Sequence, residues 1–156
     1  MDSTLSLIHA FALQHLQPFV ERRGTDEERY QLLLAMKPRD EDFGRLFQEP
    51  LLSPARALYA ALWRQPPPLL PKPGQNHLWI RTASSEDFVA WNARGQEFPG
   101  GYRKLGPHLG PELAWVAFKF VIEGDFTGLS FDGLVWLDNR FAWFPQPWRL
   151  VPMGPA

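Results

Sequence analysis

The chain has 156 residues and carries 16 basic and 17 acidic side chains, which leaves a formal net charge of −1 at pH 7. This length suits one ordinary globular domain, and the balanced charge argues against a broad, non-specific nucleic-acid-binding surface. The sequence contains no cysteine, which excludes disulfides, thiolate nucleophiles and zinc sites with cysteine ligands.

Residues 1–64 are expected to form a helical half. Apolar side chains recur every three or four positions near the N-terminus, which is the spacing of one helix face. Thr25 and Glu28 form the pattern of a capping box, and Ser53 followed by Pro54 is typical of a helix start. The expected helices span residues 4–23, 26–36, 40–47 and 54–63.

Residues 65–76 are predicted to form an extended connector. Five prolines in this stretch remove backbone donors and restrict φ, so it can be neither a helix nor a central strand. The alternative is a docking ligand, because Pro68-Leu69-Leu70-Pro71 fits the PxxP pattern.

Residues 77–156 are expected to form a β-rich half, in which apolar and polar side chains alternate with period two. A two-residue turn at Asp138-Asn139 is predicted to close a hairpin. The expected strands span residues 77–81, 114–122, 129–137 and 140–144. The resulting cross-strand pairs are Trp136 with Phe141 and Leu134 with Trp143. Both faces of this sheet are apolar, which predicts cover on each side or a partner on one.

Two further segments lie between the first two strands. Ser84 is predicted to cap a short helix that carries Phe88 and Trp91. Residues 92–111 are rich in glycine and proline and are interpreted as a long loop, a kind of segment that often carries function.

These elements predict one α+β domain over residues 1–156, with N-terminal helices packed on a curved antiparallel sheet of three to four strands. The N-terminus lacks the basic region of a secretory signal, and no apolar run approaches the roughly 20 residues needed to span a bilayer. We therefore expect a cytoplasmic protein.

No catalytic or metal-binding motif in the sequence is complete. The four histidines have no metal-binding spacing, and the GxxxxG spacing at Gly101 is followed by Pro107-His108 where a phosphate loop requires Lys-Ser/Thr. The stretch from Gly128 to Gly133 misses the GxSxG elbow by one residue. We expect no metal and no cofactor, and the interpretation leans away from an enzyme.

Asp132 is the most interesting acidic residue. Strict alternation places it on an apolar sheet face, where its pKa rises unless a cation pairs with it. Lys119, Arg140 and Arg149 are the candidate cations. The alternative is that Asp132 caps a bulge beside Gly133 or faces water.

Residues 133–149, GLVWLDNRFAWFPQPWR, carry a resemblance. They look like the closing hairpin of small, uncharacterised bacterial α+β proteins, whose layout is similar to NTF2-like or cystatin-like folds. The resemblance covers the last third of the chain, and its motif is structural. It implies no catalytic residues, and it implies a role as an immunity or accessory protein only by analogy at the level of the fold.

The leading hypothesis is a non-catalytic protein-binding domain. Its specific form is an immunity-type inhibitor or accessory factor that recognises a partner protein such as a toxin or effector. No nucleic-acid or membrane partner is expected, and the sheet also offers a surface for a homodimer. Aromatic rings beside cations suit an acidic protein surface. The predicted binding residues are Tyr102, Arg103, Lys104, Trp136, Trp143 and Arg149.

Two alternatives remain open. Trp136 and Trp143 are equally well explained as core residues beneath the N-terminal helices. The second function considered is a small-molecule-binding or hydrolytic NTF2-like domain, with a pocket near Asp132 and Lys119.

Overall fold

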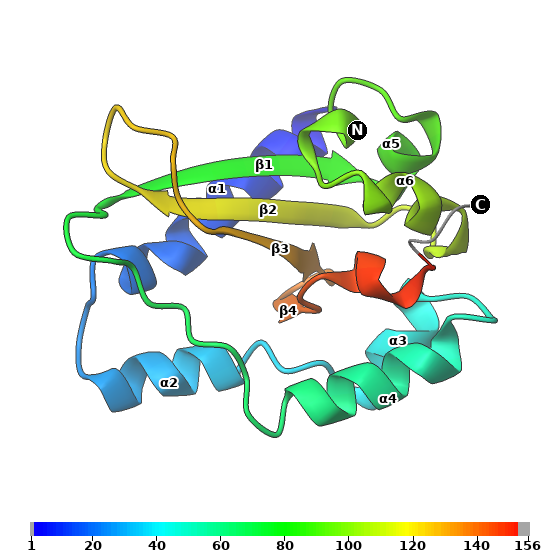
Figure 1. Ribbon diagram of the computed structural model, residues 1–156, viewed down its shortest axis with the longest axis horizontal. Helices are drawn as coiled ribbons and strands as arrows, with labels where there is room; N and C mark the ends of the chain where they lie inside the picture. Colours follow the sequence, from blue (N-terminus) through cyan, green and yellow to red (C-terminus); the bar gives the residue numbers. More distant parts are fainter. Residues whose placement is uncertain (1, 153–156) are drawn as a thin grey trace.

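A four-stranded antiparallel sheet, in the order β1-β2-β3-β4, organises the chain (Figure 1). The structure is a computed structural model that describes residues 2–152, without the side chain of residue 2. The strands are β1 (His77–Ser84), β2 (Ala114–Val121), β3 (Ser130–Trp136) and β4 (Phe141–Trp143). Each strand pairs with the one that follows it in the chain.

Four helices precede the sheet, as expected, and their ends lie within three residues of the predicted ones. They are α1 (Asp2–Val20), α2 (Asp26–Leu34), α3 (Asp40–Leu46) and α4 (Leu52–Leu62). The capping box of α2 is present, because Thr25 Oγ1 accepts the Glu28 N–H and a Glu28 carboxylate oxygen accepts the Thr25 N–H, each at 3.1 Å. The sheet and the preceding helices confirm the α+β class.

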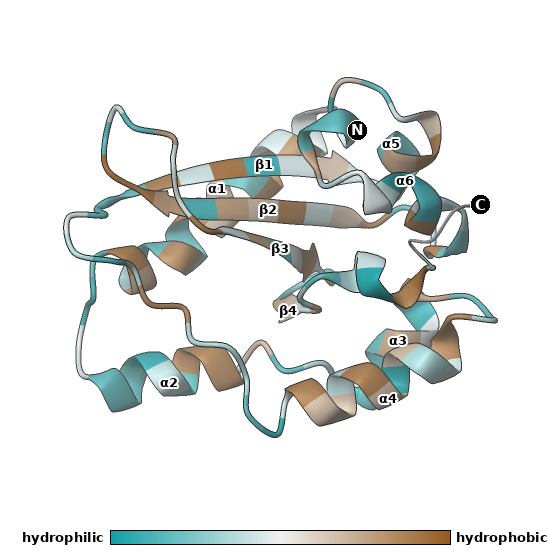
Figure 2. Ribbon diagram, viewed as in Figure 1, coloured by the Kyte–Doolittle hydropathy of each residue, from teal (hydrophilic) through white to brown (hydrophobic). Residues whose placement is uncertain are grey.

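The helices cover the sheet in two places (Figure 1). α1 lies behind β1 and β2 and buries one apolar stripe against them. α2, α3 and α4 form a layer beyond β4. The backbone N–H of Trp143 in β4 donates to the carbonyl of Met36, which follows α2, at 2.9 Å. Figure 2 shows that β2 is apolar along most of its length, as a strand covered on both faces must be.

The segment predicted as a loop at 92–111 contains ordered helical turns instead. Helix α5 (Ser85–Ala90) begins at the predicted Ser84 cap and is followed by η1 (Gly95–Glu97), α6 (Gly101–Leu105) and η2 (Gly106–His108). The prediction failed because Tyr102 and Leu105 are buried against the sheet, and this packing compensates for the low helix propensity of the surrounding glycines and prolines.

The β3–β4 hairpin has the predicted register. Its two-residue turn is closed by the Leu137 N–H, which donates to the Arg140 carbonyl at 2.8 Å. The cross-strand pairs are Leu134 with Trp143, Val135 with Ala142 and Trp136 with Phe141.

Strict alternation fails at the start of β3. The pairing with β2 shifts register, so that Phe118 faces Phe131 while Val116 faces Leu134. Gly133 has a φ of +83°, and a Cβ at this position would lie 1.9 Å from the Phe144 carbonyl oxygen. Of the two alternatives weighed for Asp132, the bulge beside Gly133 is therefore the one that the structure has, and strict alternation does not hold.

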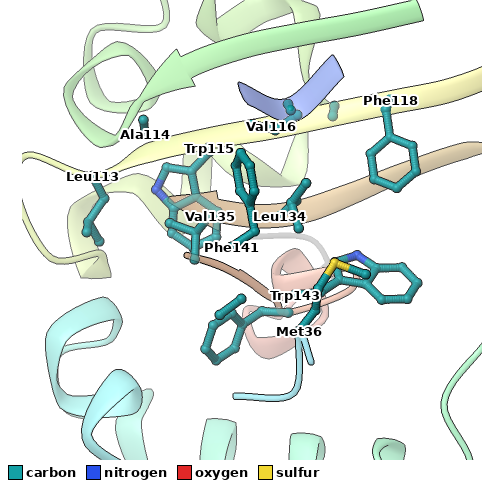
Figure 3. Close-up of a cluster of buried hydrophobic side chains, with 14 of the residues drawn as sticks. Met36, Leu113, Ala114, Trp115, Val116, Phe118, Leu134, Val135, Phe141 and Trp143 are labelled. Atoms are coloured by element: carbon teal, nitrogen blue, oxygen red, sulfur yellow. The ribbon is translucent and has the colours of Figure 1, made fainter. Parts of the chain in front are cut away.

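The buried side chains form one continuous cluster drawn from both the helical and the β-rich residues. Figure 3 shows Trp143 beside Met36 at one end of this cluster and Trp115 near Leu113 at the other. The 65–76 connector contains no helix or strand. Over residues 2–152, no helix is both long enough and apolar enough to cross a bilayer.

Candidate functional site

The predicted binding residues divide into buried and exposed groups. Tyr102 is 0% exposed and Trp143 is 1% exposed, so neither ring can contact a partner of the folded chain, and their prediction as contact residues is wrong. Trp136 is half-buried between the rings of Phe11 and Phe141, with centroid separations of 5.1 and 4.9 Å. These placements support the core interpretation for Trp143 and leave Trp136 at the edge of the core.

The three predicted cations all remain exposed, and the fold gathers them. α6, which carries Arg103 and Lys104, lies beside η3 (Pro147–Leu150), which carries Arg149 (Figure 1). Lys104 and Trp148 line one hollow of about 320 Å³, whose other walls are Pro99, Gly100 and Gly101. The name α6–η3 surface is used below for Arg103, Lys104, Trp148 and Arg149.

The charge on this surface is not compensated locally. Arg149 donates to the side-chain oxygen of Gln146 at 3.3 Å, which is a neutral partner. Among residues 2–152, no carboxylate forms an ion pair with Arg103, Lys104 or Arg149. The surface therefore presents one cation, Lys104, at an apolar hollow, and two further cations on the same two elements.

Buried aromatic rings hold α6 in place. The Tyr102 ring lies 4.7 Å from Phe88, 5.2 Å from Phe98 and 6.4 Å from Trp115, measured between centroids. The Trp115 indole also donates to Ser85 Oγ at 3.0 Å. Because several rings fix this five-residue helix, Arg103 and Lys104 are carried on a rigid base despite the short helix length.

Hydrogen bonds to Asp132 hold η3 in place. Its carboxylate accepts the Gln146 N–H at 2.9 Å and the Trp148 indole N–H at 3.3 Å, while its carbonyl accepts the Trp143 indole N–H at 2.9 Å. The carboxylate is therefore a structural acceptor that positions the Trp148 ring. Burial raises the pKa of Asp132, and the hydrogen bonds from Gln146 and Trp148 oppose that rise.

None of the three candidate ion-pair partners of Asp132 pairs with it. Lys119 lies 4.7 Å from the Trp79 ring centroid and donates to a loop carbonyl, Arg140 pairs with Asp42, and Arg149 contacts Gln146. Asp132 is only 6% exposed. The pocket predicted around Asp132 and Lys119 therefore has no basis in these contacts.

Over residues 2–152, no three histidine, aspartate or glutamate side chains are arranged to hold a metal ion together.

Trp148 is the residue of this surface that the predicted set of binding residues did not include. Its sequence signal was weak, because a tryptophan between Pro147 and Arg149 is equally typical of a tail that covers a sheet edge. Only the fold shows that its indole is anchored by Asp132 while its ring lines a hollow with Lys104.

Comparison of the chain with protein-family models, with curated proteins and with solved structures finds no match. What the α6–η3 surface can do is therefore interpreted from its residues and their geometry.

Proposed function

We propose that this protein is a non-catalytic protein-binding domain that uses the α6–η3 surface to recognise an acidic patch on a partner protein, in the manner of an immunity-type inhibitor or accessory factor. The observation that carries the proposal is the hollow lined by Lys104 and Trp148, on two adjacent elements that also carry Arg103 and Arg149, three exposed cations without ion-pair partners among residues 2–152. Tryptophan and arginine are the side chains most enriched at interface hot spots.

The two kinds of side chain have different roles in this proposal. Trp148 supplies an anchored apolar contact, since its ring is already oriented by the bond from its indole to Asp132 and loses little freedom on binding. Arg103, Lys104 and Arg149 supply electrostatic attraction, which raises the association rate and excludes partners with a basic surface.

Charge reversal on α6 tests the proposal. The wild-type protein, R103E/K104E and the control R23E/K72E are each immobilised and exposed to a native lysate of the source organism. Both double variants change the net charge equally, and the control cations lie in segments that meet elsewhere on the molecule, where Arg22 donates to the Pro71 carbonyl. Arg23 also pairs with Glu21, an ion pair that the control removes. Melting temperatures are measured first to establish that all three proteins are folded.

We expect one protein to be retained stoichiometrically by the wild type and by R23E/K72E, and at least ten-fold less by R103E/K104E. Equal retention by all three baits would show that α6 is not the interface. Equal loss from both double variants would show that only net charge matters, and this outcome would also contradict the proposal. So would the absence of any stoichiometric partner.

A further inference from the structure

A second hollow, of about 430 Å³, lies between the beginning of α3 and α4, and none of its lining residues belongs to the α6–η3 surface. Its floor is aromatic and consists of Phe43, Tyr59 and Trp63, all of which are buried. The rings are held firmly: the Tyr59 hydroxyl donates to the Pro145 carbonyl at 3.0 Å, and Trp63 meets Trp143 edge-to-face at 6.2 Å. The floor is therefore preformed.

The rim of this hollow is positively charged. Lys37, Arg56 and Arg64 line it, and all three are exposed, whereas Asp40 is the one carboxylate among the lining residues. Arg56 is held with its guanidinium carbon 5.3 Å from the Phe43 ring centroid. Within residues 2–152, neither Lys37 nor Arg64 forms an ion pair. The rim therefore carries an excess of two positive charges.

Trp63, which lines the hollow, also carries an unmet hydrogen-bond donor. Its side chain is 6% exposed, and its indole N–H is buried without a partner among the described residues. Buried donors in native proteins are nearly always paired, so an unpaired donor on a residue that lines a hollow points to an acceptor that the described residues do not supply.

We propose that this hollow binds a small aryl anion, that is, a flat apolar ring that carries a carboxylate or phosphate group. The aromatic floor favours a flat ring by stacking and edge contacts. The guanidinium groups of Arg56 and Arg64 favour an anionic group, because each can donate two parallel hydrogen bonds to it. The volume lies within the range of small-molecule sites. The proposal is independent of partner binding by the α6–η3 surface.

Titration with 2-naphthoate tests this site, with calorimetry and the indole ¹H–¹⁵N signals of the labelled protein as the two measurements. The Trp63 signal is assigned by its absence from the spectrum of W63F. We expect saturable binding at one site and a shift of the Trp63 signal. The neutral analogue 2-naphthalenemethanol lacks the anion and inorganic phosphate lacks the ring, so each should bind at least ten-fold more weakly.

The variant R56Q/R64Q should weaken binding of 2-naphthoate at least ten-fold with an unchanged melting temperature. The matched control R103Q/K104Q removes the same charge elsewhere and should bind like the wild type. The proposal is overturned if no saturable binding occurs, if the Trp63 signal does not move, or if both double variants lose affinity equally. Binding of hexaglutamate without binding of 2-naphthoate would also overturn it, since it would identify an acidic peptide as the ligand.

Discussion

Replacement of Trp143 by alanine should destabilise the protein strongly, although its ring was a plausible binding residue from the sequence. The side chain is 1% exposed and contacts Trp63 and Phe131, each with a centroid separation of 6.2 Å. Its indole N–H donates to the buried Asp132 carbonyl at 2.9 Å. The ring therefore links the helical layer to the bulged start of β3.

The magnitude follows from these contacts. Removal of a buried tryptophan ring costs about 3–5 kcal/mol in free energy of unfolding, and an unpaired buried carbonyl adds about 1–3 kcal/mol. Because small domains have a total stability of about 5–15 kcal/mol, W143A could unfold completely. W143F retains most of the ring and loses the donor, so it should cost about 1–3 kcal/mol and stay folded.

Urea denaturation followed by far-UV circular dichroism measures these differences. Trp136→Ala is the matched control, because Trp136 shares a sheet face with Trp143 but is only half-buried. We expect W143A to lose more free energy of unfolding than W136A. A loss below about 1.5 kcal/mol for W143A, which is far under the range for a buried tryptophan, would refute the reasoning. So would a larger loss for W136A than for W143A.

Three further predictions concern the residues that shape the β-rich half and its contact with α3. Gly133→Ala should lower the free energy of unfolding by at least about 2 kcal/mol, since a side chain at positive φ is strained and the new Cβ would collide with the Phe144 carbonyl 1.9 Å away; equal urea midpoints for the two proteins would contradict this. Burial raises the pKa of Asp132 above its ordinary value of 3.8, so the folded state binds this proton more tightly than the unfolded state does. The free energy of unfolding should therefore fall as pH rises above 3.8. Urea denaturation at a series of pH values should show that Asp132→Asn removes this contribution; an identical pH dependence in wild type and variant would refute it. Asp42→Ala should cost about 3 kcal/mol, the lower end of the range for a buried pair, because it leaves the partly buried guanidinium of Arg140 without its carboxylate partner. A loss under about 1 kcal/mol in thermal or urea unfolding, of the order of a surface pair, would count against it.

Local chemistry made much of the fold predictable. The capping boxes at Thr25 and Ser84 each join a side chain to a backbone group three residues away. Four consecutive residues are therefore enough to predict each of them. The turn at Asp138 is equally local, since φ is +64° there and a short polar residue tolerates that conformation. The hairpin register followed from this turn.

Features that depend on distant residues were not predictable. α6 is held by the packing of Tyr102 on Phe88 and Trp115, which lie 14 and 13 positions away, because five residues flanked by glycines and prolines are too short to form a stable helix on their own. The course of Asp132 depends on the close approach of Gly133 to the Phe144 carbonyl. The sequence around Tyr102 carries no signature of its contacts, whereas Gly133 indicated a bulge but not which backbone group it approaches.

The candidate site was predicted in part for the same reason. The exposure of Arg103, Lys104 and Arg149 was predictable, because charged side chains are rarely buried. Their gathering on one surface depends on the C-terminal tail folding back, which the Asp132 bonds to Gln146 and Trp148 stabilise. The sequence alone could not choose between a contact surface and a cover for the sheet edge.

The dissociation constant of the purified partner for the wild type and for R103E/K104E, measured by calorimetry at low and high salt, tests the α6–η3 surface most directly. Binding by exposed cations predicts at least ten-fold weaker affinity for R103E/K104E, a wild-type affinity that falls as salt rises, and an unchanged melting temperature for both proteins. An equal dissociation constant for the two proteins at low salt would contradict recognition through this surface.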